Sequence, residues 1–214
     1  MNIETILFDM DGIVVDSERL HIEAFEAALN KFSIKVSDEV MLEFVGRSDE
    51  SFFEYIYNEV SNKHTEEEML EEKHKQYDSI SKNLQYIKGV EDFINLVKAK
   101  GLKRAMVTSS AKLTVAKADR VLDHIMHFDT VVAEEDTNRH KPFPEPYLLG
   151  LERTKSDPKT TLVIEDSING IKAGKAAGCI VVGMTTSFGK DRLLEAGADM
   201  AFDTYEELAE WLFA

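Results

Sequence analysis

Residues 5–16 read Thr-Ile-Leu-Phe-Asp-Met-Asp-Gly-Ile-Val-Val-Asp, and this stretch decides both the fold class and the place of the site. Its first four residues form an unbroken apolar run, which is typical of a strand covered on both faces of a parallel sheet. Asp9 and Asp11 follow at once, and burying two carboxylates is costly unless a cation or a reaction uses them. Gly12 then permits a tight turn. The stretch therefore predicts a buried strand that delivers two acids to one end of a sheet.

Short apolar runs of the same kind recur along the chain, and helical patterns lie between them. The further expected strands are 105–108, 130–133, 162–164, 180–183 and 200–202. The helices expected around them are 90–100, 112–123, 144–154, 168–177 and 205–213. Alternation of strand and helix predicts an α/β fold with a doubly wound, parallel, Rossmann-like sheet.

One long stretch breaks this alternation. Between residues 17 and 85 we find helical patterns and no convincing strand, with expected helices at 20–32, 37–44, 50–62 and 66–83. The Glu-rich part of the last helix, 66–72, is expected to be a solvated face. We therefore predict an α/β core made of residues 1–16 and 87–214, with an all-helical cap domain inserted at 17–86.

Composition excludes several classes of function. The chain of 214 residues has 25 Lys and Arg against 40 Asp and Glu, a net charge of −15. Nucleic acids and anionic membranes need a basic footprint, so neither is an expected partner. The sequence has no apolar run near 20 residues and no signal-peptide pattern. Its one cysteine, Cys179, permits no internal disulfide, and we expect a cytoplasmic protein.

Polar residues follow the second and third expected strands. Thr108 and Ser109 precede an expected helix, where hydroxyls and backbone N–H groups form an anion site, although one of them could simply cap the helix. Lys141 lies before a Pro-x-Pro sequence after the third strand. Ligands of open α/β sheets bind beyond the carboxyl ends of the strands, so these side chains are expected to lie near Asp9.

Acidic residues end the fourth expected strand. Glu165 and Asp166 follow an apolar run, and Asp166 could either cap the next helix or join Asp9 and Asp11 around a cation. Hard carboxylates without clustered Cys or His favour Mg²⁺ over Zn²⁺. Carboxylates, hydroxyls and one ammonium at four strand ends indicate phosphoryl transfer. The chain lacks a P-loop sequence, so a P-loop kinase or nucleotidase is not supported.

Four motifs in this order resemble those of the haloacid dehalogenase-like phosphohydrolases. They are Asp9-x-Asp11-Gly12, Thr108, Lys141-Pro142 and Glu165-Asp166. The resemblance runs from residue 6 to about residue 183. The helical insertion after the first motif resembles the branch that contains β-phosphoglucomutase and small sugar-phosphate phosphatases.

The resemblance implies a role for each residue in the reaction. Asp9 would be the nucleophile that forms an aspartyl-phosphate, and Asp11 would protonate the leaving oxygen and then help to activate water. Thr108 and Lys141 would hold the phosphoryl group. The dehalogenases of the superfamily lack an acid at the position of Asp11, because a halide leaves without a proton. Asp11 therefore favours phosphoester chemistry.

The resemblance also implies a cofactor and a substrate class. Asp9, Asp166 and the backbone carbonyl of Asp11 would bind Mg²⁺, with Glu165 assisting as a ligand or through water. The expected partner is a small phosphorylated metabolite, with Ser109 among its candidate contacts, and the branch favours a monomer.

Two activities remain open at this point. His21 matches a cap-hinge histidine of β-phosphoglucomutase, and the loop around Arg47 aligns with the loop by which that mutase reads its substrate. Val45 and Asp49 fall where the mutase has a lysine and an arginine that grip a second phosphate. Arg47 could replace them or could be a solvated surface residue. We expect a Mg²⁺-dependent phosphatase of a small phosphorylated sugar or polyol, with a phosphosugar mutase as the alternative.

Overall fold

Six parallel strands form a sheet in the order β3-β2-β1-β4-β5-β6 in the computed structural model, which describes residues 2–214. The strands are β1 (Thr5–Phe8), β2 (Lys103–Val107), β3 (Thr130–Val132), β4 (Thr161–Glu165), β5 (Ile180–Met184) and β6 (Met200–Phe202). All six expected strands are confirmed, with bounds that shift by at most two residues. In the doubly wound order, β1 and β4 are neighbours at the point where the order reverses.

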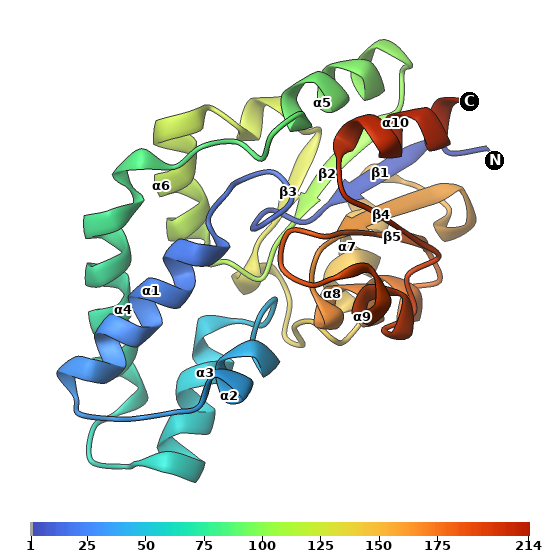
Figure 1. Ribbon diagram of the computed structural model, residues 1–214. Coiled ribbons are helices and arrows are strands. Elements are labelled where there is room, and N and C mark those ends of the chain that lie inside the picture. Colours follow the sequence, from blue (N-terminus) through green and yellow to red (C-terminus); the bar gives the residue numbers. More distant parts are fainter. Residues whose placement is uncertain (1) are drawn as a thin grey trace.

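Helices cover both faces of the sheet (Figure 1). One face carries α5 (Val90–Ala99), α6 (Lys112–Leu122) and α10 (Tyr205–Phe213), and the other carries α7 (Glu145–Thr154), α8 (Ile168–Ala176) and α9 (Lys190–Glu195). Side chains of β1 alternate between the two cores, because Ile6 and Phe8 pack on the first face and Leu7 on the second. The sequence did not predict α9, a short charged helix in which only Leu193 is buried.

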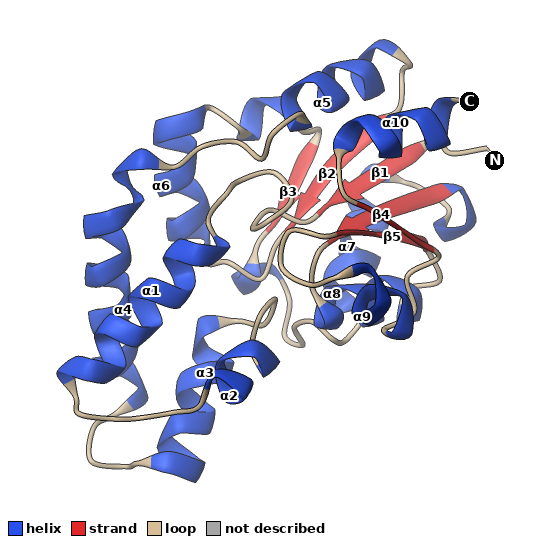
Figure 2. Ribbon diagram, in the orientation of Figure 1, coloured by secondary structure: helices blue, strands red, loops and turns tan. Residues whose placement is uncertain are grey.

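The stretch between β1 and α5 is helical, as predicted, and Figure 2 shows its helices and loops lying to one side of the strands. It holds α1 (Glu18–Lys31), α2 (Asp38–Glu43), α3 (Asp49–Tyr55), the π-helical turn η1 (Ile56–Val60), α4 (Glu66–Ile80) and the 3₁₀ turn η2 (Ser81–Asn83). The single helix expected at 50–62 is thus split into α3 and η1. A separate apolar cluster, including Ala28, Phe52, Phe53 and Met69, holds these helices together.

Local sequence signals set where these helices begin. Ser37, Ser48 and Thr65 each accept a backbone N–H at the first turn of α2, α3 and α4, and Thr65 forms a capping box with Glu68. The expected solvated face at 66–72 is only partly present, because Glu72 is buried.

The two chain segments that join the helical stretch to the sheet run side by side. The backbone N–H of Asp16 donates to the carbonyl of Gln85 at 2.9 Å, and that of Ile87 donates to the carbonyl of Val14 at 3.0 Å. Helices α1 and α4 then pack along each other (Figure 1). Within residues 2–214, we find no helix that is long and apolar enough to cross a membrane.

Candidate active site

A buried ion pair joins the end of β1 to the loop after β3. The Lys141 ammonium lies 2.5 Å from Asp9 Oδ1 and 2.7 Å from Glu165 Oε1, and it donates to the carbonyl of Val107 at 3.0 Å. Burial alone would lower the pKa of Lys141, but the carboxylates of Asp9 and Glu165 outweigh burial and raise it. Lys141 therefore stays cationic beside Asp9.

Three acids meet at the carboxyl ends of β1 and β4. One carboxylate oxygen from each of Asp9, Glu165 and Asp166 lies within 4.8 Å of the others, and all three residues are buried. Burial raises the pKa of Asp9 well above its usual value, and the neighbouring acids add to that rise while Lys141 opposes it. A second cation would relieve this charge, and an all-oxygen donor set suits Mg²⁺. The residues therefore fit a magnesium site.

Gly12 is required where Asp166 meets the loop after β1. Its φ is +74°, and a Cβ built on it would lie 1.9 Å from Asp166 Oδ2. The same oxygen accepts hydrogen bonds from Ser187 at 2.5 Å and Thr186 at 3.1 Å. These contacts hold the Asp166 carboxylate against the loop that carries Asp9 and Asp11.

Both oxygens of Glu165 are occupied by protein donors. Oε1 accepts from Lys141 and, at 2.6 Å, from Tyr147. Oε2 accepts from the Ser167 hydroxyl at 2.9 Å and from the backbone N–H groups of Asp166 and Ser167, each at 3.2 Å. A carboxylate with this set of donors is suited to fixing Lys141 and the start of α8.

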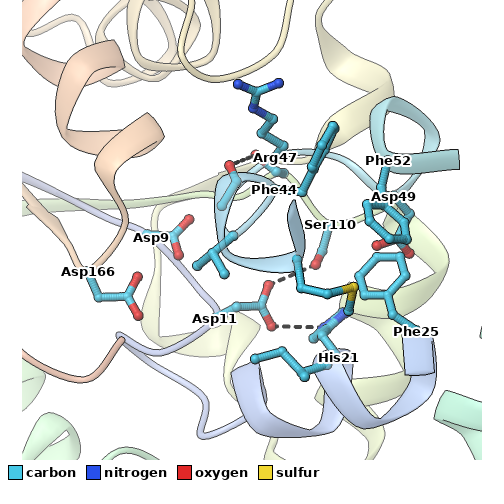
Figure 3. A pocket seen from close by; sticks show the side chains of 15 residues that line it. Asp9, Asp11, His21, Phe25, Phe44, Arg47, Asp49, Phe52, Ser110 and Asp166 are labelled. Carbon is cyan, nitrogen blue, oxygen red and sulfur yellow. Dashed lines mark hydrogen bonds and ion pairs between the residues drawn. The ribbon is translucent and has the colours of Figure 1, made fainter. Parts of the chain in front are cut away.

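The Asp11 carboxylate is held by side chains from the start of α1 and from the loop after β2. Ser17 donates to Oδ1. Ser110 donates to Oδ2 at 2.8 Å, and His21 Nε2 lies 3.3 Å from Oδ1 (Figure 3). Thr108 Oγ1 is more distant, 3.5 Å from Oδ2, and accepts the Ser110 N–H at 2.9 Å. Burial would raise the pKa of Asp11, but His21 and the hydroxyl donors outweigh it and lower the pKa to about 2.

Behind His21 lies a buried lysine that contacts the ring. Lys73 Nζ is 2.9 Å from His21 Nδ1 and 2.5 Å from Asp49 Oδ2. An ammonium can only donate, so Nδ1 accepts, and the ring hydrogen is carried on Nε2, the atom that faces Asp11. Asp49 is in turn 3.4 Å from His74 Nε2. A polar chain thus runs from Asp11 through His21 and Lys73 to Asp49.

The loop between α2 and α3 closes over the sheet. Ser109 Oγ donates to the carbonyl of Gly46 at 3.0 Å, and Asn169 Nδ2 donates to the carbonyl of Val45 at 3.1 Å. Arg47 is exposed, its guanidinium lies 4.8 Å from the centre of the Phe44 ring, and it points away from Asp9 and Asp11 (Figure 3). Of the three predicted substrate-binding residues, His21 lies beside Asp11 and Ser109 contacts the loop between α2 and α3. Arg47 points away from the acids.

Several site residues were not predicted from the sequence. Ser17 and Asn169 are polar residues beside predicted motifs, and nothing in the sequence separates them from helix caps. Lys73 did leave a signal, because it stands four residues after Met69 and four before Tyr77, both of which are buried. A lysine at a core-facing position of a helix needs a buried anionic partner.

Comparison with known proteins agrees with this geometry. Residues 6–184 match the haloacid dehalogenase-like hydrolase family. A phosphorylated carbohydrates phosphatase of Thermotoga maritima is 30% identical over 198 residues, which are 91% of this chain and 92% of that protein. Pyrophosphatase PpaX of Anoxybacillus flavithermus is 30% identical, covering 97% and 96% of the two chains. A phosphoglycolate phosphatase of Salmonella typhi is 26% identical, covering 97% and 91%.

Solved structures share the fold. A hydrolase from Pseudomonas syringae gives a TM-score of 0.89 at 20% identity, covering 98% of this chain and 97% of that one. A β-phosphoglucomutase from Clostridium difficile gives 0.84 at 24% identity, covering 99% and 96%. Because the family match spans most of the sequence, the protein belongs to the haloacid dehalogenase-like hydrolases and is an enzyme of that family.

Proposed function

We propose that this enzyme is a Mg²⁺-dependent phosphatase that hydrolyses the monophosphate of a small sugar or polyol through an aspartyl-phosphate on Asp9. One observation carries the proposal: Asp9 lies at a strand end between the Lys141 ammonium and a second buried carboxylate, Asp166. That arrangement supplies a nucleophile together with positive charge for a phosphoryl group. The names of the phosphatase relatives support the same reaction class.

The proposal divides the chain into a catalytic core, residues 1–16 and 87–214, and a cap, residues 17–86. The two crossing segments are hydrogen-bonded to each other, and the cap has its own apolar cluster. A cap joined to the core by two adjacent connecting segments can move towards the sheet or away from it. Closure towards the sheet would exclude water from the reaction.

Magnesium would be held by the carboxylates of Asp9 and Asp166 and by the backbone carbonyl of Asp11. Glu165, whose oxygens already accept from protein donors, would fix Lys141. When bound, the ion supplies positive charge to the phosphoryl oxygens and favours the ionised form of Asp9.

In the first step, an Asp9 oxygen attacks phosphorus, and the bond from phosphorus to the leaving oxygen breaks. Asp11 gives its proton to that oxygen, so the alcohol leaves neutral. The pKa of Asp11, about 2 in this structure, rises when a phosphoryl dianion lies beside it, because like charges oppose ionisation. Thr108 and Lys141 would bind the phosphoryl oxygens.

In the second step, water attacks the phosphorus of the aspartyl-phosphate and gives a proton to Asp11. The bond between Asp9 and phosphorus breaks, which releases inorganic phosphate and restores both carboxyl groups. His21, with its hydrogen fixed on Nε2, keeps the Asp11 carboxylate oriented in both steps.

The orientation of Arg47 supports hydrolysis over phosphosugar isomerisation. A mutase has to hold a bisphosphate and turn it around, which needs cations on the cap side of the pocket. Among the described residues that line the cavity, Arg47 is the one lysine or arginine, and its exposed guanidinium is directed away from Asp9 and Asp11 (Figure 3).

The test follows free phosphate from the purified protein with Mg²⁺ over a panel of sugar and polyol phosphates. Asp9→Asn should abolish release, and chelation should do the same, while Asp16→Asn, which changes an exposed acid in the same loop, should retain activity. Acid-quenched protein should carry a hydroxylamine-sensitive phosphate in wild type and none in Asp9→Asn. Wild-type turnover by Asp9→Asn would exclude the covalent mechanism. Conversion of β-glucose 1-phosphate, primed with the 1,6-bisphosphate, into glucose 6-phosphate without free phosphate would favour the mutase.

A further inference from the structure

The cap side of the active-site cavity is apolar except at a few places. Ile22, Phe25, Met41, Phe44 and Phe52 line it opposite the acids of the sheet. Aromatic and aliphatic side chains suit the C–H face of a carbon chain or sugar ring. The polar groups among them therefore decide which leaving alcohol is accepted.

Asp49 is the acid on this side. It lies in the first turn of α3, lines the cavity, and its side chain is 18% exposed (Figure 3). Burial alone would raise the pKa of Asp49, but Lys73, His74 and His21 outweigh burial and hold the pKa well below its usual value. The carboxylate is thus negatively charged in the cavity at neutral pH.

Among the described residues that line the cavity, Arg47 is the one lysine or arginine, and its guanidinium lies over the Phe44 ring, 4.8 Å from the ring centre. Arg47 points away from the acids, and Lys73 lies behind the lining with its side chain 1% exposed. The Lys73 ammonium is already committed to Asp49 and to His21 Nδ1. A carboxylate or second phosphate placed beside Asp49 would meet a like charge whose counter-ion, Lys73, lies behind the lining, whereas a hydroxyl could donate to Asp49.

We infer that Asp49 determines the leaving-group specificity of this enzyme: it accepts monophosphates whose leaving alcohol is uncharged and carries a further hydroxyl, and it rejects those with a carboxylate or a second phosphate. The inference rests on the proposed phosphatase function. This substrate preference would distinguish the enzyme from its pyrophosphatase and phosphoglycolate phosphatase relatives, whose names indicate substrates with anionic leaving groups.

The test compares substrates that differ only in that charge. One pair is 2-hydroxyethyl phosphate and 2-phosphoglycolate, and the other is sorbitol 6-phosphate and 6-phosphogluconate. Wild type should favour the alcohol of each pair by about tenfold or more in kcat/KM, as expected for one uncompensated charge. Asp49→Asn should reduce that ratio about tenfold, because it leaves the Lys73 charge without its counter-ion beside the cavity.

Two further variants make the result specific. Glu54→Gln removes an exposed negative charge from the same helix and should keep the wild-type ratio. The double variant D49N/K73M removes both charges together and should also lose the preference, which covers the case in which Asp49→Asn alone folds poorly. Its absolute rates are expected to fall, because Lys73 contacts His21.

The outcomes separate the two proposals. Equal kcat/KM for both members of each pair in wild type, or an unchanged ratio in the folded Asp49 variants, would overturn the specificity assignment and leave the phosphatase intact. Absence of phosphate release from all four substrates and from the wider panel would overturn the phosphatase itself.

Discussion

Replacing Gly46 with alanine should prevent the cap loop from closing fully on the sheet. A Cβ at this position would lie 2.2 Å from Ser167 Oγ and 2.5 Å from Ser167 Cβ. Ordinary carbon contacts are about 3.5–4.0 Å, so the loop has to retreat by roughly 1 Å. Ser167 has little freedom to yield, because its hydroxyl accepts the Gly170 N–H at 2.9 Å and donates to Glu165.

A displacement of this size should lower kcat/KM for phosphate release by about 100-fold, since misplacing groups by roughly 1 Å has effects of that order. Backbone strain is a separate cost to stability, because Gly46 has a φ of +76°, where a non-glycine residue costs about 1–2 kcal/mol. Gly101 provides the matched control, with a φ of +75° and nothing within 4 Å of an added Cβ. Gly101→Ala should therefore show the strain in its melting temperature and leave kcat/KM unchanged.

The double variant G46A/S167G tests the contact itself. Removing both Ser167 atoms relieves the clash, so the double variant should recover about tenfold of the activity that Gly46→Ala loses, after correction for Ser167→Gly alone. Strictly additive effects, or a Gly46→Ala enzyme as active as Gly101→Ala, would refute the reasoning that this contact sets cap closure.

Three further changes have defined outcomes. Burial and then Glu50 raise the pKa of Glu134 from 4.5 to about 9, so its contribution to stability is full below pH 4.5 and is lost as the pH rises towards 9. Glu134→Gln should therefore raise the melting temperature at pH 8 and leave it unchanged at pH 4.5, while the exposed control Glu152→Gln should change neither. Lys141→Met leaves two buried carboxylates without their cation and should lower the free energy of unfolding in urea at pH 7 by about 3–5 kcal/mol. Magnesium should raise the melting temperature of wild type, and Asp166→Asn should abolish that rise, because an ion that binds only the folded state stabilises it.

The sheet could be predicted from sequence because its signals are local. Residues 6–8 are apolar and buried, and the predicted run 5–8 forms β1 without a shift in bounds. Motif residues at strand ends then had to meet, because parallel strands present their carboxyl ends at one edge. Asp9, Lys141 and Asp166 are together in the structure for this reason.

Contacts between the cap and the sheet could not be predicted in the same way. Asn169 and Val45 are 124 residues apart, and their hydrogen bond depends on how two separately packed units face each other. Lys73 was not predicted because most other charged residues of its helix are solvated, although its spacing from Met69 and Tyr77 indicated a buried position. The split of the helix at 50–62 likewise has no signal that we recognise in the sequence.

If both proposals hold, specificity and catalysis depend on the same ammonium, that of Lys73. Lys73 Nζ contacts Asp49, which faces the leaving group, and His21, which faces Asp11. A change in the charge at Asp49 therefore alters the partner of His21 Nδ1, and with it the donor that orients the acid–base residue. In the proposed mechanism, leaving-group selection is therefore not a property of the cap alone, because the lysine that pairs with Asp49 also fixes the tautomer of His21, which contacts Asp11.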